Sequence, residues 1–366
     1  MTTDNPEIRQ AFSLVQAAKI FEELVDKTED IGFPEFSLGD IFNSYRIVEH
    51  LIPTYLSSVY RAEHTTVDQP AVIKFIKTDS PLKALEEIRK AHDLLHRIDP
   101  QYTARWLDGG RIFVDRSGAP VNPEHPEANE IYFQILEFIE GQTLREYIGK
   151  AIPETSKALQ IALDILDAVS AVHEVGWMHC DIKTENIMIT PDEAVKIIDF
   201  GLSQKLGEGN PARYGSPGYL PPEVKAGQPW TFAGDLYSTS CVLTSLLVGE
   251  NSGDSNGPRK DWGLVEQKTG KKIRSLLQKN QSVDPESRSA SIEDFFTSFK
   301  IAAEQITKAP METDAYYRLK VDELRQKADN KKRLGPKHRA EQIELAEAAD
   351  ALEAWLEQSR PDGLPD

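Results

Sequence analysis

The chain has 366 residues, long enough for two or three packed units of about 150 residues, and its 40% hydrophobic and 28% charged residues are typical of a folded protein. Acidic residues exceed basic ones by 59 to 42, and the net charge of −17 repels phosphate backbones and anionic lipid, so we expect no nucleic-acid or membrane partner. Only two cysteines occur, which excludes a disulfide framework and a cysteine-built zinc or iron–sulfur site. Without a signal-peptide pattern or a bilayer-length apolar run, we expect a cytoplasmic protein.

The first third of the chain changes from a helical to a β-rich pattern. Residues 5–27 predict an amphipathic helix, which a glycine- and proline-bearing break at 31–34 ends. Strands are predicted over 45–52, 56–62, 71–77, 111–116 and 130–138. One helix, over 81–96, interrupts them behind an N-cap at Asp79 or Ser80. The proline-rich stretch 117–130 predicts a long hairpin loop between the last two strands.

The remainder of the chain is mainly helical. Helices are predicted over 156–175, 230–248, 266–280 and 291–306, with short strands near 187–189 and 195–198. A strand-rich unit followed by a helix-rich unit predicts two lobes with a cleft between them. The tail, 311–358, carries two matching apolar stripes around a breaker at 334–336 and predicts a helical hairpin. Its basic cluster at 331–339 is interpreted as a solvated turn rather than a site for an anionic partner.

The stretch 179–201 carries the chemistry. It contains His179-Cys180-Asp181-Ile182-Lys183-Thr184-Glu185-Asn186 and then Asp199-Phe200-Gly201, and it resembles the catalytic loop and the metal-binding motif of Hanks-type protein kinases. Phosphoryl transfer needs a carboxylate that accepts the proton of the attacking hydroxyl, oxygens that hold Mg²⁺, and cations that neutralise the γ-phosphate. The resemblance implies that Asp181 is the base and Lys183 a γ-phosphate contact. It also implies that Asn186 and Asp199 hold Mg²⁺ or Mn²⁺.

The resemblance extends upstream to residues that bind ATP in this family. Ala71-Val72-Ile73-Lys74 is similar to the strand that carries the phosphate-binding lysine, which makes Lys74 a catalytic residue. The family pairs this lysine with a glutamate on the helix that follows. We expect Glu87 to be that partner, with Glu86 as the alternative; the alignment with the usual family spacing assumes one extra helical turn. The segment 135–141 resembles the hinge between the lobes. The ATP-binding set implied is Lys74, Ile52, Val59, Ala71, Leu136, Glu137, Ile139, Asn186 and Asp199, with Leu136 beside adenine and the Glu137 carbonyl and Ile139 amide on the adenine edge.

Three downstream features are similar to the architecture of protein kinases. The sequence GSPGYLPPE over 215–223 resembles the end of the activation loop, and its Glu223 is expected to pair with Arg288. Asp235 matches the aspartate at the start of the central helix that ties down the catalytic-loop backbone. Kinases of small molecules generally lack these features, so they argue against a sugar or antibiotic kinase.

Two departures from the family pattern affect the details. The phosphate-covering loop near 52–57 contains no glycine, which predicts weaker ATP binding or a changed loop conformation. Cys180 stands where most members have an arginine that pairs with a phosphorylated activation-loop residue, so the chain is of the non-RD type. The loop 202–215 offers only Ser203 and Tyr214 as hydroxyl bearers, and we therefore expect activity without activation-loop phosphorylation.

The resemblance predicts an α+β, bilobal protein-kinase fold. Its expected parts are an N-terminal helical extension (1–44), a β-rich N-lobe (45–139), a helical C-lobe (140–305) and a C-terminal helical hairpin tail (306–366). The function it implies is an ATP- and Mg²⁺-dependent serine/threonine kinase that acts on a protein substrate. The alternative is a pseudokinase scaffold, favoured by the glycine-free loop. The terminal helices are expected to recruit a partner, self-associate or dock on the kinase domain, and the sequence does not separate these.

Overall fold

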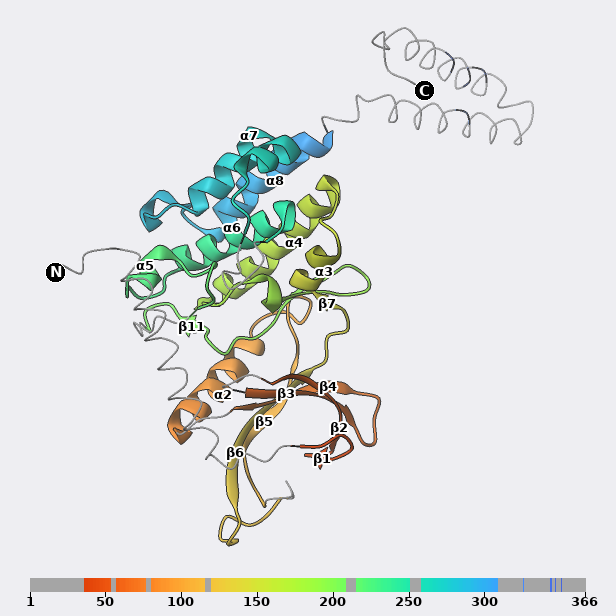
Figure 1. The fold of residues 1–366 in the computed structure, drawn as a ribbon, viewed down its shortest axis with the longest axis vertical. Coiled ribbons are helices and arrows are strands. Elements are labelled where there is room, and N and C mark those ends of the chain that lie inside the picture. Colours follow the sequence, from red (N-terminus) through yellow and green to blue (C-terminus); the bar gives the residue numbers. More distant parts are fainter. Residues whose placement is uncertain are drawn as a thin grey trace, which may run out of the picture.

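The computed structural model describes residues 36–308, apart from 54–56, 77–79, 116–119, 209–214 and 251–257, together with isolated positions at 325, 343, 346 and 350. A strand-rich lobe and a helical lobe follow each other along the chain and lie at opposite ends of the described part (Figure 1). The predicted α+β, two-lobed fold is therefore confirmed. The helix predicted over 5–27 and the hairpin predicted over 311–358 lie outside the described residues, apart from the four isolated positions.

The N-lobe is built on one antiparallel sheet of six strands in the order β1-β2-β3-β4-β6-β5. The strands are β1 (Ile41–Phe42), β2 (Tyr45–Pro53), β3 (Ser57–His64), β4 (Pro70–Ile76), β5 (Trp106–Val114) and β6 (Asn129–Glu137). The predicted strands are present, and β5 begins five residues earlier than expected because Gly109 and Gly110 interrupt its alternating pattern. β5 and β6 pair directly, as expected for a hairpin, and the predicted loop 117–130 ends two residues late because β6 begins at Asn129.

Aromatic residues that precede the predicted N-lobe boundary at 45 pack in its core. Phe36 stacks on Phe75 with ring centroids 4.6 Å apart, and Phe42 meets Phe75 and Phe133 edge-on. Phe42 also lies in β1, which pairs with β2. The structure therefore includes residues 36–44 in the N-lobe, whereas the sequence predicted an extension over 1–44.

A single helix, α2 (Pro81–Leu95), covers part of the sheet and brings Glu87 to the site. Ala84 and Ile88 are buried in one cluster with Ile76 of β4 and Tyr132 of β6. This apolar contact fixes the rotation of α2 about its axis, and thereby decides which acidic side chain turns toward the sheet.

The C-lobe packs its helices around the buried helix α6 (Phe232–Val248). The elements of this lobe are β7 (Gln142–Thr143), α3 (Leu144–Lys150), α4 (Thr155–Glu174), β8 (Trp177–Met178), η1 (Thr184–Asn186), β9 (Ile187–Ile189), β10 (Val195–Ile197), β11 (Gln204–Lys205), α5 (Pro222–Lys225), α6, α7 (Trp262–Asn280), η2 (Pro285–Ser287) and α8 (Ile292–Lys308). The predicted long helices are present. Among the described helices, none has both the length and the apolar character needed to cross a membrane.

The sequence reading missed α3, although the chain carries a signal for it. Thr143 caps this helix by accepting a hydrogen bond from the Glu146 amide at 3.1 Å, and the Glu146 carboxylate accepts one from the Thr143 amide at 2.9 Å. This reciprocal pair is the capping box that the pattern T-x-x-E predicts.

Candidate active site

Asp181 is the centre of a hydrogen-bonded cluster in the loop 179–186, which we call the catalytic loop. Its side chain is 9% exposed, and its Oδ2 lies 2.8 Å from Lys183 Nζ and accepts a hydrogen bond from Asn186 Nδ2 at 3.1 Å. The single turn η1 brings Asn186 back toward Asp181, and Nδ2 also donates to the Asp181 carbonyl at 2.9 Å. The structure thus brings three predicted site residues into one network.

Ser216 completes this network, and the sequence reading gave it no role. Its amide and its hydroxyl both donate to Asp181 Oδ1, at 3.1 and 2.9 Å. Its hydroxyl also accepts a hydrogen bond from Lys183 Nζ at 2.9 Å. Ser216 lies in the recognised GSPGYLPPE segment, directly after its first glycine. Its role could not be predicted from that segment alone, because its partner Asp181 lies 35 positions earlier in the chain.

The second cluster joins the two lobes through Lys74. Lys74 Nζ on β4 lies 3.0 Å from Asp199 Oδ1 and 3.5 Å from Glu87 Oε1 on α2. Glu86, the alternative partner, instead pairs with Lys90 at 2.9 Å on its own helix. Glu87 is therefore the acidic residue that the structure places at Lys74.

Lys74 and Asp199 hold each other in their ionised forms. Burial alone would lower the pKa of Lys74, but Asp199 and Glu87 outweigh it and raise that pKa above its ordinary value. Lys74 in turn lowers the pKa of Asp199 to about 2, against the opposing effect of burial. Burial raises the pKa of Glu87, and the charge of Lys74 opposes that rise. At neutral pH the cluster offers one ammonium group and one fully ionised carboxylate for binding phosphate and metal.

Gly201 and Phe200 fix the conformation of the segment that carries Asp199. A Cβ at Gly201 would lie 3.1 Å from Lys74 Nζ and 3.3 Å from both Asp199 Oδ1 and Glu87 Oε1, closer than most Cβ contacts. Phe200 is 6% exposed and packs against His179, with ring centroids 4.9 Å apart. The small residue thus leaves room for the charged cluster, and the aromatic residue anchors the segment in the C-lobe core.

Asp235, fully buried near the start of α6, holds the backbone of the catalytic loop. Its carboxylate accepts hydrogen bonds from the amides of His179 and Cys180, at 2.7 and 3.0 Å. His173 Nε2 of α4 lies 2.9 Å from the same carboxylate. The contact predicted for Asp235 is confirmed, and it ties α4, α6 and the loop together.

The Cys180 side chain packs among apolar residues. It is buried in an apolar cluster with Met178, Val224 and Trp230, and burial raises the pKa of its thiol. Ser203, the nearest hydroxyl in the chain after Asp199, is 4% exposed and donates to the His179 carbonyl at 3.2 Å. This hydroxyl serves the fold of the loop, and its burial restricts access to it.

Glu223 and Arg288 form the predicted ion pair of the C-lobe. The guanidinium donates from Nη1 to Glu223 Oε1 at 2.6 Å and from Nη2 to Oε2 at 2.7 Å. The Arg288 side chain is fully buried, and it also donates to the carbonyls of Ser282 and Ala233. All of its strong donors therefore have acceptors, which a buried guanidinium requires.

The residues predicted to surround adenine lie on neighbouring strands. Ile52 of β2 is opposite Val59 of β3, and Ala71 of β4 is opposite Glu137 of β6. The Glu137 carboxylate accepts hydrogen bonds from the amide and the guanidinium of Arg105, at 3.1 and 3.2 Å. Leu136 pairs with Val72 in the same ladder, and Ile139 follows β6 two residues beyond its end. The glycine-free turn includes 54–56, which lie outside the described residues.

The donor set fits a nucleotide with a divalent metal ion. Asp199 and Asn186 would offer carboxylate and amide oxygens, which Mg²⁺ prefers, and Lys74 and Lys183 would offer cations to phosphate oxygens. Within the described residues, no three His, Cys, Asp or Glu side chains gather as a metal cage.

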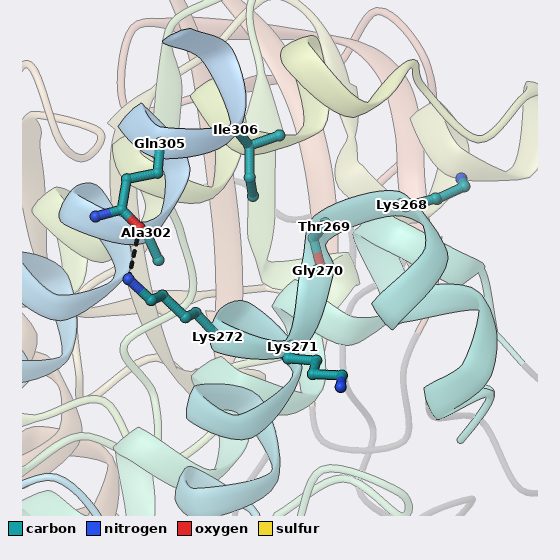
Figure 2. Close-up of a pocket in the computed structure, with 8 residues that line it drawn as sticks. All are labelled: Lys268, Thr269, Gly270, Lys271, Lys272, Ala302, Gln305 and Ile306. Carbon is teal, nitrogen blue, oxygen red and sulfur yellow. Dashed lines mark hydrogen bonds between the residues drawn. The ribbon is translucent and has the colours of Figure 1, made fainter. Parts of the chain in front are cut away.

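A surface hollow elsewhere in the C-lobe contains none of these residues. It lies where α7 kinks at Gly270, whose φ is 75°, and is lined by Lys268, Thr269, Lys271 and Lys272 of α7 and by the last turns of α8 (Figure 2). Lys272 Nζ donates to Gln305 Oε1 across it at 2.7 Å. The candidate site lies elsewhere, where Lys74 of the N-lobe meets Asp199 of the C-lobe.

Comparison with known proteins gives one consistent family. The family model described as "Protein kinase domain" matches residues 55–327. The serine/threonine-protein kinase PknB of Mycobacterium tuberculosis is 35% identical over 209 residues, covering 55% of this chain and 32% of PknB. The probable PknB of Lactococcus lactis is 33% identical over 223 residues, covering 58% of this chain and 33% of that protein. The chain thus matches about a third of the length of these relatives.

Solved structures support the fold. The kinase domain of PknI from Mycobacterium tuberculosis, as a double mutant, aligns with a TM-score of 0.55 at 18% sequence identity, covering 74% of this chain and 99% of that domain. A second structure of the same domain aligns with a TM-score of 0.53. These structures show the fold, and the family match over more than half of the chain shows that the chain belongs to the Hanks-type protein kinase family.

Proposed function

We propose that this chain is an ATP- and Mg²⁺-dependent serine/threonine protein kinase. The observation that carries the proposal is the pair of clusters described above, in which Asp181 contacts Lys183, Asn186 and Ser216 while Lys74 contacts Asp199 and Glu87. Mg²⁺-bound ATP supplies the γ-phosphoryl group. The relatives named serine/threonine kinases support the same class of acceptor.

Each charged side chain has a distinct task in this proposal. Asp181 orients the hydroxyl of a protein substrate and accepts its proton, while Lys183 neutralises charge on the transferred group. Asn186 and Asp199 hold the metal ion. Lys74 binds phosphate oxygens, and Glu87 fixes the position of Lys74.

Activity without activation-segment phosphorylation belongs to the same proposal. We define the activation segment as residues 199–223. The apolar surroundings of Cys180 support this inference, because a phosphate group would find no guanidinium at that position. The cytoplasmic location expected from the sequence stays a prediction, as does a role for the terminal segments in binding a partner.

The test is phosphate transfer from radiolabelled ATP with Mg²⁺, with and without a generic basic protein substrate. We expect labelling of serine or threonine in the wild type and none in Asp181→Ala, whose folding and nucleotide binding are checked by thermal shift. Labelled tyrosine would contradict the class of acceptor. Nucleotide-dependent stabilisation without any labelling would contradict the kinase activity itself and favour a scaffold role.

A further inference from the structure

Two ion pairs connect α2 directly to the activation segment. Lys205 Nζ of β11 lies 3.0 Å from Asp93 Oδ2, and Glu208 Oε2 lies 3.8 Å from Lys90 Nζ. Asp93 and Lys90 both belong to α2, whereas Lys205 and Glu208 follow the catalytic cluster in the C-lobe. β11 lies where the two lobes meet (Figure 1). The pairs therefore join the lobes at a place distinct from the contact between Lys74 and Asp199.

One row of neighbouring side chains on α2 makes all of these contacts. Glu87, Lys90 and Asp93 follow one another at intervals of three residues, so each is a neighbour of the next on the surface of the helix. Glu87 meets Lys74, and the next two turns meet Glu208 and Lys205. A rotation of α2 that withdrew Glu87 would break the other two pairs as well. The position of Glu87 is thus coupled to the positions of β11 and Glu208.

Lys205 is the best-placed of the four residues to transmit this coupling. Its backbone is paired with Trp177 of β8, which leads directly into the catalytic loop. Its ammonium group lies 5.1 Å from the centre of the Trp177 ring, a cation–π contact, as well as 3.0 Å from Asp93. The bond from Lys205 lowers the pKa of the Asp93 carboxyl, followed by the bond from Arg97. This side chain of the activation segment therefore touches both α2 and the strand before the catalytic loop.

The two described serines of the activation segment already have hydrogen-bond partners. Ser203 is buried and donates to the His179 carbonyl, and the Ser216 hydroxyl is bonded to both Asp181 and Lys183. Cys180 has an apolar environment. A phosphate on either serine would displace contacts that the catalytic loop needs, whereas the ion pairs of Lys205 and Glu208 hold the segment without one.

We propose that Lys205 and Glu208 are positioning residues, which hold α2 through Asp93 and Lys90 so that Glu87 stays at Lys74 without a phosphate on the activation segment. The proposal rests on the proposed kinase function. In family members with the catalytic-loop arginine, a phosphorylated residue holds the activation segment in place. In this chain, the Glu208 carboxylate and the Lys205 ammonium group do so.

The experiment compares Lys205→Asp, Asp93→Lys and the double variant with both changes. We expect each single variant to lower kcat by about tenfold with a less than about twofold change in the KM for protein substrate, and the double variant to recover most of the loss because the pair is restored with reversed charges. Arg111→Glu is the matched control, since Arg111 pairs with Glu130 at 2.9 Å in the same lobe but on the hairpin of β5 and β6. The control should keep the wild-type kcat. Intact mass spectrometry of the same active wild-type preparation should show that it carries no phosphate.

Hydrogen exchange of the amides in 81–95 gives a readout that does not depend on turnover. Lys205→Asp and Asp93→Lys should speed exchange in α2, and the double variant should slow it again. A wild type that transfers no phosphate would contradict the proposed function, while the exchange data would still decide the coupling. Either single variant behaving like Arg111→Glu in both measurements would overturn the inference. So would a double variant as impaired as the worse single variant, or a wild type active only when phosphorylated.

Discussion

The carboxylate of Asp235 accepts a hydrogen bond from the amide of Cys180 at 3.0 Å, and Cys180 at that point has a φ of 65°. A side chain other than glycine in this left-handed region costs about 1–2 kcal/mol. The buried acceptor and the apolar cluster around the thiol hold the residue there. The strained residue lies directly before Asp181, so the conformation that Asp235 maintains also sets the position of the candidate base.

Replacing Asp235 with asparagine should therefore harm both stability and transfer. The amide has one acceptor oxygen where Asp235 uses two, and its NH₂ group would face an amide donor of His179 or Cys180. We expect Asp235→Asn to lower the free energy of unfolding by about 2–3 kcal/mol, measured by urea denaturation, and to lower kcat. Asp294→Asn, on the exposed side of α8, is the control and should change neither. Equal stability of Asp235→Asn and wild type would contradict the anchoring role.

Ser216 should matter for turnover more than for folding. Its hydroxyl links Asp181 and Lys183, and removal of bonds to charged groups costs about 1.5–3 kcal/mol each. We expect Ser216→Ala to reduce kcat by about tenfold or more, while Ser216→Thr, which keeps the hydroxyl, stays within about threefold of the wild type. Steady-state kinetics with a protein substrate measure the effect. If Ser216→Ala and Ser216→Thr had equal kcat, the hydroxyl would have no part in the reaction.

The choice between Glu86 and Glu87 as the partner of Lys74 shows how much of the site could be predicted from the sequence. Both side chains were candidates, and the motif spacing left them open. The apolar positions Ala84, Ile88 and Ala91 mark the buried face of α2, and Glu87 lies three residues after the first and four before the last. This helical spacing places Glu87 beside the buried face, which is turned toward the sheet, and Glu86 on the solvent side. The sequence therefore held the answer in its helical periodicity, although the motif alone did not.

Other features could not be predicted from local patterns. The strands β8 and β11 have two residues each, too few for any alternation to be recognised. The pairing of Lys205 with Asp93 joins side chains that are far apart in the chain and carry no motif. Their contact depends on how the lobes pack, which spacing within one segment does not determine. The long helices and the catalytic motifs were predictable because periodicity and fixed spacing are local properties.

Gly201 should not tolerate even a methyl group without a loss of activity. A Cβ at this position would lie 3.1 Å from the Lys74 ammonium group and 3.3 Å from Asp199 Oδ1. Because three charged groups meet there, the added atom must displace at least one of them. We expect Gly201→Ala to lower kcat/KM for ATP by about tenfold or more, measured by initial rates over a range of ATP concentrations. Gly263→Ala is a control, because its added Cβ would meet only Asp261 Oδ1, at 3.6 Å.

The Glu223–Arg288 pair gives a prediction about stability. Removing one partner of a buried ion pair leaves an uncompensated charge, and this typically costs about 3–5 kcal/mol. We expect Arg288→Met to lose about that much unfolding free energy, and the double variant Glu223→Gln/Arg288→Met to lose less, since the lone carboxylate is gone. Urea denaturation of the two variants measures the difference. A double variant less stable than Arg288→Met would contradict this account.

The contact between Lys74 and Asp199 predicts a dependence of stability on pH. Lys74 lowers the pKa of Asp199 to about 2, below its ordinary value of 3.8, and His179 and Lys183 act in the same direction. Because the folded state holds this carboxyl ionised more strongly than the unfolded state does, its contribution is complete above pH 3.8 and is lost as the pH falls toward 2.

We expect the wild type to be more stable than Asp199→Asn by a margin that shrinks by about 1 kcal/mol between about pH 5 and pH 2.5. The figure is smaller than the full pKa shift would give, because the Asp199 side chain is 47% exposed and solvent screens the pair. Urea midpoints of both proteins across this range measure the margin. In a Lys74→Met background the margin should lose most of its dependence on pH, because the cation that lowers the pKa most is absent. A margin that shrinks equally with and without Lys74 would show that another group is responsible.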